Sequence, residues 1–324
     1  MKKANIAVLS DGAWGCAVAV LLSNNGSEVR LWGPFPENIR EIRKKGENTK
    51  FLPGIKIPSR IKLFEDIGKA VEDVEVVVLA SPSQYLRGTL EKFKPFFKKE
   101  QLLLNLAKGI ETCSLKKMSE LCEEILGKKI RYCVLSGPSH AEEVAVHCPT
   151  AVVVASKKFK EAEIIQSISM NNFFRVYTSE DLTGVELGGS LKNIFAIAAG
   201  IIDGMKLGDN TKAALITRGT AEIARFGVQL GGKPETFSGL SGVGDLIVTC
   251  YSGHSRNRYV GEELGKGRKL SYILKKLGLI VAEGVTTTNS AYQLAKKAKV
   301  ETPIINEMYK ILYEEKNPRK ALSD

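Results

Sequence analysis

The sequence predicts an α/β domain built on a parallel sheet, followed by a mainly α-helical domain. Up to about Thr178, short apolar runs alternate with segments of helical character, which is typical of βαβ units. From Gly184 onward the segments are long, rich in Ala, Leu, Ile and Gly, and apolar at helical period. The 324 residues are enough for two domains with sizeable cores. We expect these domains to span residues 1–182 and 183–324.

The first domain is defined by apolar runs in chain order. Residues 5–10 predict the first strand, and residues 15–26 predict a helix that ends at Gly26. Residues 27–33 predict a second strand, and residues 37–46 an amphipathic helix. The other predicted strands are continuous apolar runs, as expected for buried parallel strands, in residues 74–81, 101–109, 128–138, 150–156 and 173–179.

The second domain is predicted from its helical period. Residues 189–205 and 210–231 are the clearest helical segments. The sequence contains no tandem repeat and no low-complexity linker. We therefore expect the two domains to pack together.

Composition and charge restrict the partners. The net charge is +11, but the lysines occur as scattered pairs and form no long basic arm. We therefore expect small phosphorylated anions as ligands and no nucleic acid. The six cysteines include no C-x-x-C pair, which favours a reducing cytosol and predicts no metal site. No apolar stretch reaches about 18 uncharged residues and no signal peptide is evident, so we expect a cytoplasmic protein without membrane insertion.

A glycine-containing turn, SDGAWG, follows the first predicted strand. It matches the dinucleotide fingerprint G-x-G-x-x-G at Gly12 and Gly15, with Ser10 in place of the first glycine. In that fingerprint the second glycine lets the backbone approach a pyrophosphate, and the third allows close packing of helix on strand. The turn predicts a Rossmann-like domain with NAD or NADP bound at Gly12, Ala13, Trp14 and Gly15. A purely structural turn is the alternative.

Asp11 is unusual in such a turn. A carboxylate near a pyrophosphate would weaken cofactor binding unless its side chain points away. The choice between NAD and NADP stays open, because an acid about 20 positions after the motif would favour NAD, and no acid precedes Glu37 there. Arg30 would meet the 2′-phosphate of NADP only if it faces the cofactor.

Seven sequence blocks in a fixed order carry a family resemblance. They are WGCAVA, NTKFLPGIKIP, LAKGIE, LSGPSHAEEVA, VELGGSLKNIFAIAAGIIDG, GLSGVGDLIVTC and SGHSRNRYVGEELGKG, and the similarity extends over about residues 5–313. Together they resemble the bacterial NAD(P)-dependent glycerol-3-phosphate dehydrogenases. That family usually reads G-x-G-x-W-G in the first turn and often carries basic residues after the second strand. Here Ser10, Asp11, Pro34 and Phe35 depart from that pattern.

The resemblance implies a fold and an activity. The fold would be a Rossmann-like domain plus a helical C-terminal domain of the 6-phosphogluconate-dehydrogenase-like type, with a homodimer as the common assembly. The activity would be the reversible NAD(P)H-dependent reduction of dihydroxyacetone phosphate to sn-glycerol 3-phosphate. This reaction supplies glycerophospholipid synthesis.

Lys192 is the first candidate catalytic residue. It lies in an apolar helical run, where burial would lower its pKa toward neutrality, although a lysine reaching out to solvent would fit the same pattern. The resemblance implies that Lys192 is the catalytic lysine and Asn193 its polar partner. It also implies that Lys108, which follows a predicted strand and would otherwise be an ordinary solvated lysine, orients the substrate carbonyl.

Asp245 and the segment SGHSRNR are the next candidates. Asp245 follows a glycine-rich loop, where it could cap a helix and could also hold Lys192 or a substrate hydroxyl, since these roles are compatible. The arginine, hydroxyl and amide groups of SGHSRNR suit a phosphate, with a solvated charge cluster as the alternative. The implied substrate contacts are Lys108, Gly137, Ser139, Asp245, Ser255, Arg256 and Asn257. The implied cofactor contacts beyond the first turn are Lys108, Ala141, Arg256, Val281 and Glu283.

Two other functions stay open on the sequence alone. The chain could be a dehydrogenase of the same build for a different hydroxy acid, although the cluster at residues 255–257 favours a phosphorylated substrate. It could also be a cofactor-binding sensor in which Ser10 and Asp11 mark decay of the site. The presence of Lys108, Lys192, Asp245 and Arg256 argues against a sensor, which would not need them all.

Overall fold

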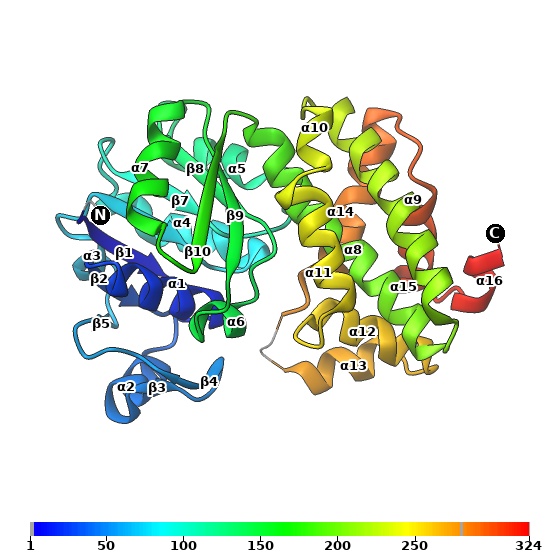
Figure 1. Cartoon of the computed structure of the whole chain (residues 1–324), viewed down its shortest axis with the longest axis horizontal. Coiled ribbons are helices and arrows are strands. Elements are labelled where there is room, and N and C mark those ends of the chain that lie inside the picture. The colour runs from blue at the N-terminus through cyan, green and yellow to red at the C-terminus, as the bar shows by residue number, and fades with distance from the viewer. Residues whose placement is uncertain (1–2, 279–280, 324) are drawn as a thin grey trace. The chain divides into compact units, whose positions relative to one another are not determined.

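Residues 3–278 and 281–323 are described by the computed structural model shown in Figure 1. The chain divides into two units. The sheet unit comprises Met1–Ala107 and Met118–Leu182, and the helical unit comprises Lys108–Lys117 and Thr183–Asp324.

The segment Lys108–Lys117 belongs to the helical unit, although we expected it in the first domain. Residues 1–182 were expected to form the first domain, but this segment packs with the helical unit. Ile110 is fully buried in the helical core, and its carbonyl accepts a hydrogen bond from Ser290 Oγ at 3.0 Å. A β-bridge between Ile110 and Lys117 closes the segment into a loop. The loop therefore carries Lys108 into the helical unit.

An eight-stranded sheet forms the centre of the sheet unit, in the order β10-β9-β8-β7-β6-β1-β2-β5. Seven of the strands lie within the seven predicted segments, and the three-residue β5 was not predicted because it is too short to show a pattern. The strands are β1 (Asn5–Leu9), β2 (Glu28–Trp32), β5 (Lys62–Phe64), β6 (Val76–Leu79), β7 (Leu102–Asn105), β8 (Arg131–Ser136), β9 (Thr150–Ala155) and β10 (Phe174–Ser179).

The sheet is not parallel throughout, contrary to the prediction, because its last two strands run in the opposite direction. Pairing is parallel from β5 through β2, β1, β6 and β7 to β8, but β9 pairs antiparallel to β8, and β10 is parallel to β9. The connection between β8 and β9 holds only the five-residue helix α6 (Ala141–Ala145). At about 1.5 Å per residue, such a helix is too short to return the chain along a six-residue strand. The chain therefore enters β9 from the same edge at which β8 ends.

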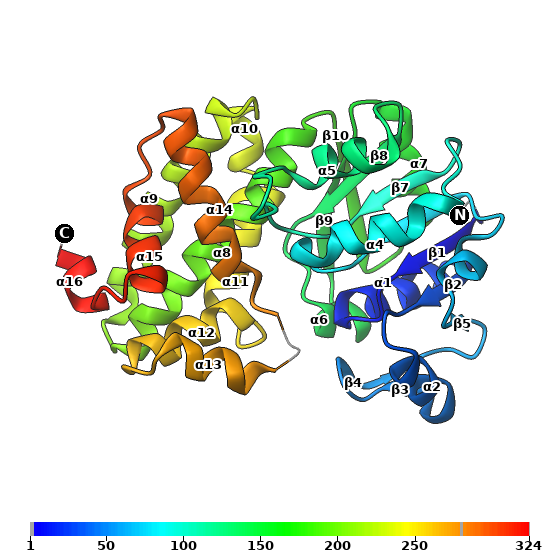
Figure 2. The ribbon, with the colours of Figure 1, turned by 180° about the vertical axis from the view of Figure 1, so that it is seen from behind.

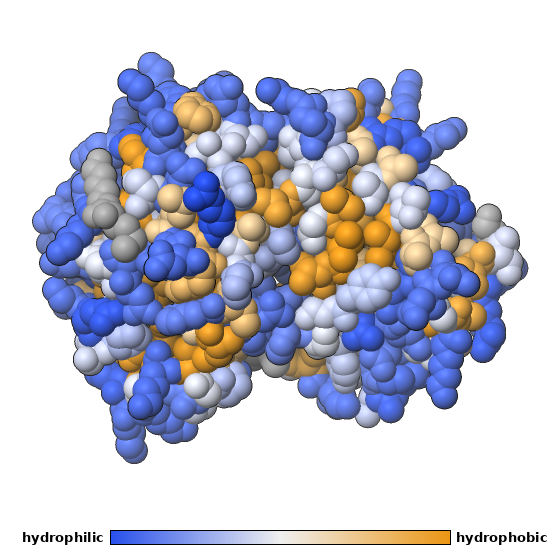
Figure 3. Space-filling view, viewed as in Figure 1, coloured by the Kyte–Doolittle hydropathy of each residue, from blue (hydrophilic) through white to orange (hydrophobic). Residues whose placement is uncertain are grey.

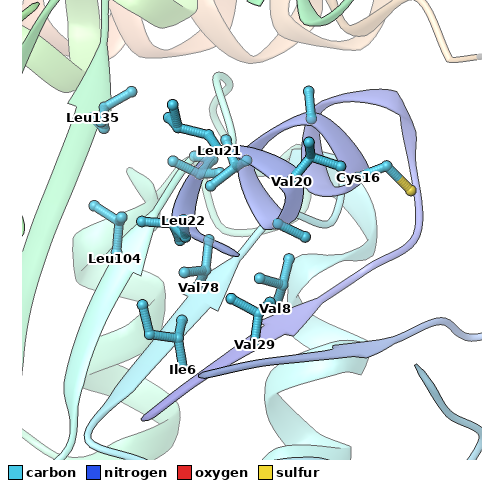
Figure 4. Packing of buried hydrophobic residues seen from close by; sticks show 14 of the residues in the cluster. Ile6, Val8, Cys16, Val20, Leu21, Leu22, Val29, Val78, Leu104 and Leu135 are labelled. Atoms are coloured by element: carbon cyan, nitrogen blue, oxygen red, sulfur yellow. The ribbon is translucent and has the colours of Figure 1, made fainter. Parts of the chain in front are cut away.

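Helices cover the sheet and bury its apolar side chains. Figure 4 shows Val20, Leu21 and Leu22 of one helix close to side chains of the strands, among them Val8 and Val78. The elements that accompany the sheet are α1 (Ala13–Asn24), α2 (Pro36–Lys45), β3 (Glu47–Asn48), β4 (Leu52–Lys56), α3 (Ile67–Val71), η1 (Ser83–Tyr85), α4 (Leu86–Phe93), η2 (Lys94–Phe96), α5 (Met118–Leu126) and α7 (Phe159–Ser169).

The helical unit has its own apolar core, distinct from that of the sheet unit. Figure 2 shows its helices from behind, and Figure 3 shows that apolar side chains reach the viewed surface only in separate patches. The elements are α8 (Leu182–Gly204), α9 (Gly208–Gln229), α10 (Pro234–Phe237), η3 (Leu240–Gly244), α11 (Asp245–Tyr251), α12 (Arg256–Gly265), α13 (Leu270–Leu277), α14 (Glu283–Ala298), α15 (Pro303–Tyr313) and α16 (Pro318–Ser323).

Helix α8 is the central element of the helical unit. Within the described residues it is the one helix long and apolar enough to cross a membrane, yet its most apolar stretch is entirely buried inside the protein. Burial of this kind is expected of a core helix.

Glycines allow α8 and α12 to touch backbone to backbone. A Cβ at Gly261 would lie 1.9 Å from the carbonyl oxygen of Ile197, and a Cβ at Gly200 would lie 2.0 Å from that of Arg258. Only residues without a side chain permit this contact. The close approach places the start of α12 beside the turn of α8 that follows Lys192.

Candidate active site

Two lysines and one carboxylate form the centre of the site in the helical unit. Lys192, on α8, and Asp245, the first residue of α11, form an ion pair between Nζ and Oδ1. Lys108 Nζ lies 2.6 Å from the other oxygen, Oδ2. The side chain of Asp245 is 1% exposed, that of Lys192 8% and that of Lys108 15%. One buried carboxylate therefore holds two ammonium groups, and the Lys108 side chain is the more accessible of the two lysines.

A tight turn places Asp245 at this centre. The residues before it form the π-helical turn η3, a local geometry that often occurs at functional sites. A Cβ at Gly188 would lie 2.6 Å from the carbonyl oxygen of Ser241, so η3 packs directly on α8. The N-cap of α11 is Gly244, with no side-chain capping bond. The helix-capping alternative for Asp245 is therefore wrong, and its carboxylate faces the lysines instead.

Thr249 is a site residue that the sequence reasoning missed. Its hydroxyl accepts a hydrogen bond from Lys192 Nζ at 2.7 Å and donates to the Asp245 carbonyl at 2.6 Å. It lies four residues after Asp245 on α11, so both side chains are on one face of the helix. That spacing could have identified it. Thr249 fixes the direction of the Lys192 ammonium.

Burial and charge give Lys192 and Asp245 the protonation states that acid–base chemistry needs. Burial lowers the pKa of Lys192 to about 8, and the charge of Lys108 acts in the same direction, whereas Asp245 opposes it. Burial alone would raise the pKa of Asp245, but Lys108 and Lys192 outweigh it and the pKa is lowered. Lys192 can therefore exchange a proton near neutral pH while Asp245 stays ionised.

Two asparagines connect the helices around the lysines. Asn257 Nδ2 donates to Asn193 Oδ1 at 3.0 Å, and the backbone N–H of Gly284 donates to Asn257 Oδ1 at 2.9 Å. Asn193 Nδ2 donates in turn to the Lys108 carbonyl at 3.4 Å. The chain of hydrogen bonds joins α8, α12, α14 and the Lys108 loop. Asn193 thus reaches Lys108, and the amide of Asn257 is already engaged within the protein.

The predicted phosphate cluster lies at the N-terminus of α12. Ser255 is its N-cap, because its Oγ accepts from the backbone N–H of Arg258 at 3.2 Å. The Arg258 guanidinium contacts Asp203 at 2.6 Å. Arg256 is exposed, and its guanidinium has no hydrogen-bond or ion-pair partner among the described residues. Arg256 and the helix N-terminus are therefore the groups that could bind an anion here.

Two predicted cofactor contacts lie close to each other in the helical unit. Val281 is half-buried and precedes α14, and Glu283 is the first residue of that helix. Both residues follow positions 279–280, which lie outside the described residues.

The predicted dinucleotide turn lies in the sheet unit, where α1 begins at Ala13 with Gly12 as its N-cap. A Cβ at Gly15 would lie 2.1 Å from the carbonyl oxygen of Ser10, so close packing of helix on strand requires this glycine. A Cβ at Gly12 would meet only Ser10 Oγ, at 3.7 Å. The indole N–H of Trp14 is buried without a partner in the described part of the chain. The turn thus offers space, and helix amides without an intrahelical partner, to an anionic ligand.

The position of this turn in the sheet also fits a dinucleotide. β1 lies between β2 and β6, where the strand order reverses, and nucleotides bind at such points at the carboxyl ends of the strands. Gly137, Ser139 and Ala141 follow β8 at the same edge, because β1 and β8 are parallel within one sheet. Ser139 Oγ donates to the Gly137 carbonyl at 3.0 Å, and Ala141 begins α6, which packs on α1. An NAD(P) cofactor therefore fits the residues of the sheet unit.

Two family models match the chain. The model of the NAD-dependent glycerol-3-phosphate dehydrogenase N-terminus matches residues 5–162, and that of the corresponding C-terminus matches residues 181–323. The chain belongs to the NAD-dependent glycerol-3-phosphate dehydrogenase family. This membership confirms the resemblance that the sequence blocks carry.

Relatives and solved structures agree with this family. The chain is 49% identical over 320 residues to the glycerol-3-phosphate dehydrogenase [NAD(P)+] of Geobacillus thermodenitrificans, covering 98% of this chain and 93% of that protein. It is 48% identical over 321 residues to the protein of the same name from Chlorobium phaeobacteroides, covering 98% and 96%.

The glycerol-3-phosphate dehydrogenase structure from Coxiella burnetii superposes with a TM-score of 0.95 at 37% identity, covering 99% of this chain and 98% of that one. A D-mandelate dehydrogenase structure shares the fold alone, with a TM-score of 0.66 at 14% identity and full coverage of both chains. The predicted fold class, a Rossmann-like domain with a helical C-terminal domain, is confirmed.

Proposed function

We propose that the chain catalyses the reversible NAD(P)H-dependent reduction of dihydroxyacetone phosphate to sn-glycerol 3-phosphate. The observation that carries the proposal is Lys192, a buried lysine whose pKa is lowered to about 8 beside the carboxylate of Asp245. The relatives that carry the name of this activity match nearly the whole chain. When bound, the nicotinamide supplies the hydride for reduction and accepts it for oxidation.

Lys192 exchanges the proton in this proposal. During reduction the carbonyl carbon gains a hydride, and Lys192 Nζ donates a proton to the oxygen, which becomes the hydroxyl group. Lys192 is then neutral and regains a proton from solvent. In the reverse direction neutral Lys192 accepts the hydroxyl proton. Asp245 and Thr249 hold the Lys192 amine in one orientation through the contacts described above.

Lys108 acts by its charge. It contacts the second oxygen of Asp245, and its side chain is more exposed than that of Lys192. A fixed positive charge beside the carbonyl stabilises the negative charge that develops on the oxygen. It also helps to lower the pKa of Lys192. Asn193 supports this arrangement through the Lys108 backbone.

The remaining predicted residues would bind the two ligands. Arg256 would hold the substrate phosphate, supported by the start of α12 at Ser255 and Asn257, with Gly137 and Ser139 as further substrate contacts. The cofactor would lie against the turn of the sheet unit. Its contacts would be Gly12, Ala13, Trp14, Gly15, Lys108, Ala141, Arg256, Val281 and Glu283.

The cellular setting is part of the same proposal. The product would supply glycerophospholipid synthesis in the cytoplasm. The protein would act as a homodimer on a small phosphorylated substrate, without a nucleic-acid partner and without inserting into a membrane. The high positive net charge of +11 would attract such anionic substrates.

A steady-state assay tests the proposal. Purified protein is mixed with NADH or NADPH and dihydroxyacetone phosphate, and oxidation of the cofactor is followed by absorbance. We expect turnover that depends on the substrate phosphate, with no turnover of dihydroxyacetone. Turnover of a 2-keto acid instead would favour a different hydroxy-acid dehydrogenase. Cofactor binding without turnover of any substrate would favour a sensor.

A further inference from the structure

The side chain of Asp11 points away from the turn in which it occurs. Asp11 is 1% exposed, and its Oδ2 accepts a hydrogen bond from Asn38 Nδ2 at 2.6 Å. Its backbone carbonyl accepts from Asn48 Nδ2 at 2.6 Å. Asn38 lies on α2 and Asn48 on β3, both of which follow β2 in the chain. The carboxylate is therefore fixed at the end of β2.

Gly33 makes room for this carboxylate. It follows the last residue of β2, and a Cβ built on it would lie 2.4 Å from the Asp11 carboxyl carbon and 2.5 and 2.7 Å from the two oxygens. The Asp11 carboxylate thus occupies the space that a side chain at position 33 would occupy. In dinucleotide-binding folds an acidic side chain at this strand end, about 20 residues after the glycine turn, binds the ribose hydroxyls of NAD.

The cations of the neighbouring elements are mostly engaged elsewhere. The Arg30 guanidinium donates to the carbonyls of Lys69 and Glu72 at 3.2 and 2.6 Å, so it faces α3. Arg40 and Arg43, on the helix that follows Gly33, both pair with Glu65. Residues 33–36 read Gly-Pro-Phe-Pro and add no charge.

The charge of Lys50 acts on the Asp11 carboxylate at this strand end. Its ammonium lies 5.3 Å from the ring centroid of Phe35 and 5.2 Å from that of Phe51, and its charge acts to lower the pKa of Asp11. Burial outweighs Lys50 and the Asn38 amide, and the pKa of Asp11 is raised overall. An anionic group beside the Asp11 carboxylate would be repelled by it.

We propose that Asp11 makes this enzyme selective for NAD(H) over NADP(H). Its carboxylate lies where a side chain at Gly33 would begin, and its negative charge replaces that of the acidic side chain that β2 lacks, so it repels a 2′-phosphate on the adenosine ribose. The inference rests on the proposed function, because it concerns the cofactor of that reaction.

Equilibrium binding tests this selectivity without any turnover. The dissociation constants of NADH and NADPH are measured by fluorescence titration for the wild type, Asp11→Asn and Asp11→Ala. Asp73→Asn, which removes an exposed carboxylate of the same unit that pairs with Lys98, is the matched control. We expect the wild type and Asp73→Asn to bind NADH more tightly than NADPH by about tenfold or more, as one unscreened charge at close range allows.

The Asp11 variants should lose most of the preference for NADH. Asp11→Asn keeps the size of the side chain and should fold even if Asp11→Ala does not. In either variant the preference should shrink to about threefold or less, chiefly because NADPH binds more tightly once the charge is gone. Lys50→Met should leave the NADH preference of the wild type in place.

Three outcomes would overturn the inference. They are equal binding of both cofactors by the wild type, a preference for NADPH that Lys50→Met abolishes, and a preference for NADH that survives in Asp11→Asn. In each of these cases the proposed function stands, because a cofactor still binds. If neither cofactor binds the wild type, the proposed function fails and the inference fails with it.

Discussion

The two units each bury one aspartate to 1% exposure, and the two carboxylates have opposite pKa shifts. In the helical unit Asp245 is paired with two ammonium groups, and its pKa is lowered. In the sheet unit Asp11 has the Asn38 amide as its hydrogen-bond donor, and its pKa is raised. Equal burial therefore does not decide the direction in which the pKa of a carboxylate shifts; its neighbours do.

This difference supports the different tasks that we propose for the two carboxylates. Asp245, whose pKa is lowered, forms ion pairs with Lys192 and Lys108, and in the proposed function it holds both lysines for proton transfer. Among the described residues no cation forms a hydrogen bond to the Asp11 carboxylate, and in our further inference Asp11 acts on the cofactor that binds beside it. Substitutions in each unit can show whether the helical unit provides the chemistry and the sheet unit binds the cofactor.

The largest expected effect is on turnover when Lys192 is replaced. Lys192→Ala removes the proton donor and should lower kcat by about 10²–10⁴-fold. Lys192→Arg should fail as well, because a guanidinium does not release its proton near neutral pH. NADH affinity, measured by fluorescence titration, should barely change. The exposed Lys266→Ala, on the same unit, is the control and should keep normal turnover.

Near-normal kcat in a folded Lys192→Ala protein, with folding checked by circular dichroism, would contradict the assignment. Lys108 would then be the candidate proton donor.

Replacing Arg256 should affect substrate binding instead of turnover. Arg256→Ala removes the exposed guanidinium at the start of α12 and should raise the KM for dihydroxyacetone phosphate by about 10- to 100-fold, the range of a charged hydrogen bond. The kcat at saturation should change much less. Steady-state kinetics separate the two parameters. An unchanged KM would show that the phosphate binds elsewhere.

The glycine contact between α8 and α12 predicts a loss of stability. Gly261→Ala would place a methyl group 1.9 Å from the Ile197 carbonyl, and the helices would have to separate. We expect a loss of about 1–3 kcal/mol in the free energy of unfolding, measured by urea denaturation. Gly88→Ala, in α4, is the control because a Cβ there meets no atom within 4 Å. Equal stability of both variants would argue against the close packing.

The smallest expected effect concerns the first turn of the sheet unit. Ser10 has a φ of 122°, a conformation that side chains rarely adopt. Ser10→Gly should relieve strain of about 1 kcal/mol or more and raise the Tm by roughly 2–4 °C, with NADH binding retained. A lower Tm in differential scanning calorimetry would show that the serine hydroxyl, which lies 3.4 Å from the Gly12 amide, stabilises the turn more than the strain costs.

The strands of the sheet could be predicted because each buried strand is a continuous apolar run. The direction of β9 could not, because it depends on how far the short α6 carries the chain and not on a pattern in β9 itself. The helices α8 and α9 were predicted from their period. The loop that takes Lys108 into the helical unit is fixed by contacts such as that of Ile110 with Ser290, which are 180 residues apart.

The site was predicted to different extents in the two units. Lys192 and Asp245 were found as candidates, but residue types alone could not show whether Asp245 capped its helix or faced the lysines. The π-helical turn before Asp245 decides this. The direction of the Asp11 side chain could not be predicted from the sequence either, because it depends on the absence of a side chain at Gly33, 22 residues away. Short-range patterns thus predicted the residues, and long-range contacts determine where their side chains point.

The pH dependence of turnover tests most directly the central claim that Lys192 exchanges the proton. Reduction needs protonated Lys192, so kcat should be constant below the pKa of about 8 and fall about tenfold per pH unit above it. Oxidation of glycerol 3-phosphate needs the neutral amine and should rise through the same pKa. Lys192→Ala should lose this dependence in both directions. A reduction rate that stays constant up to about pH 10, or a variant that keeps the wild-type profile, would contradict the account.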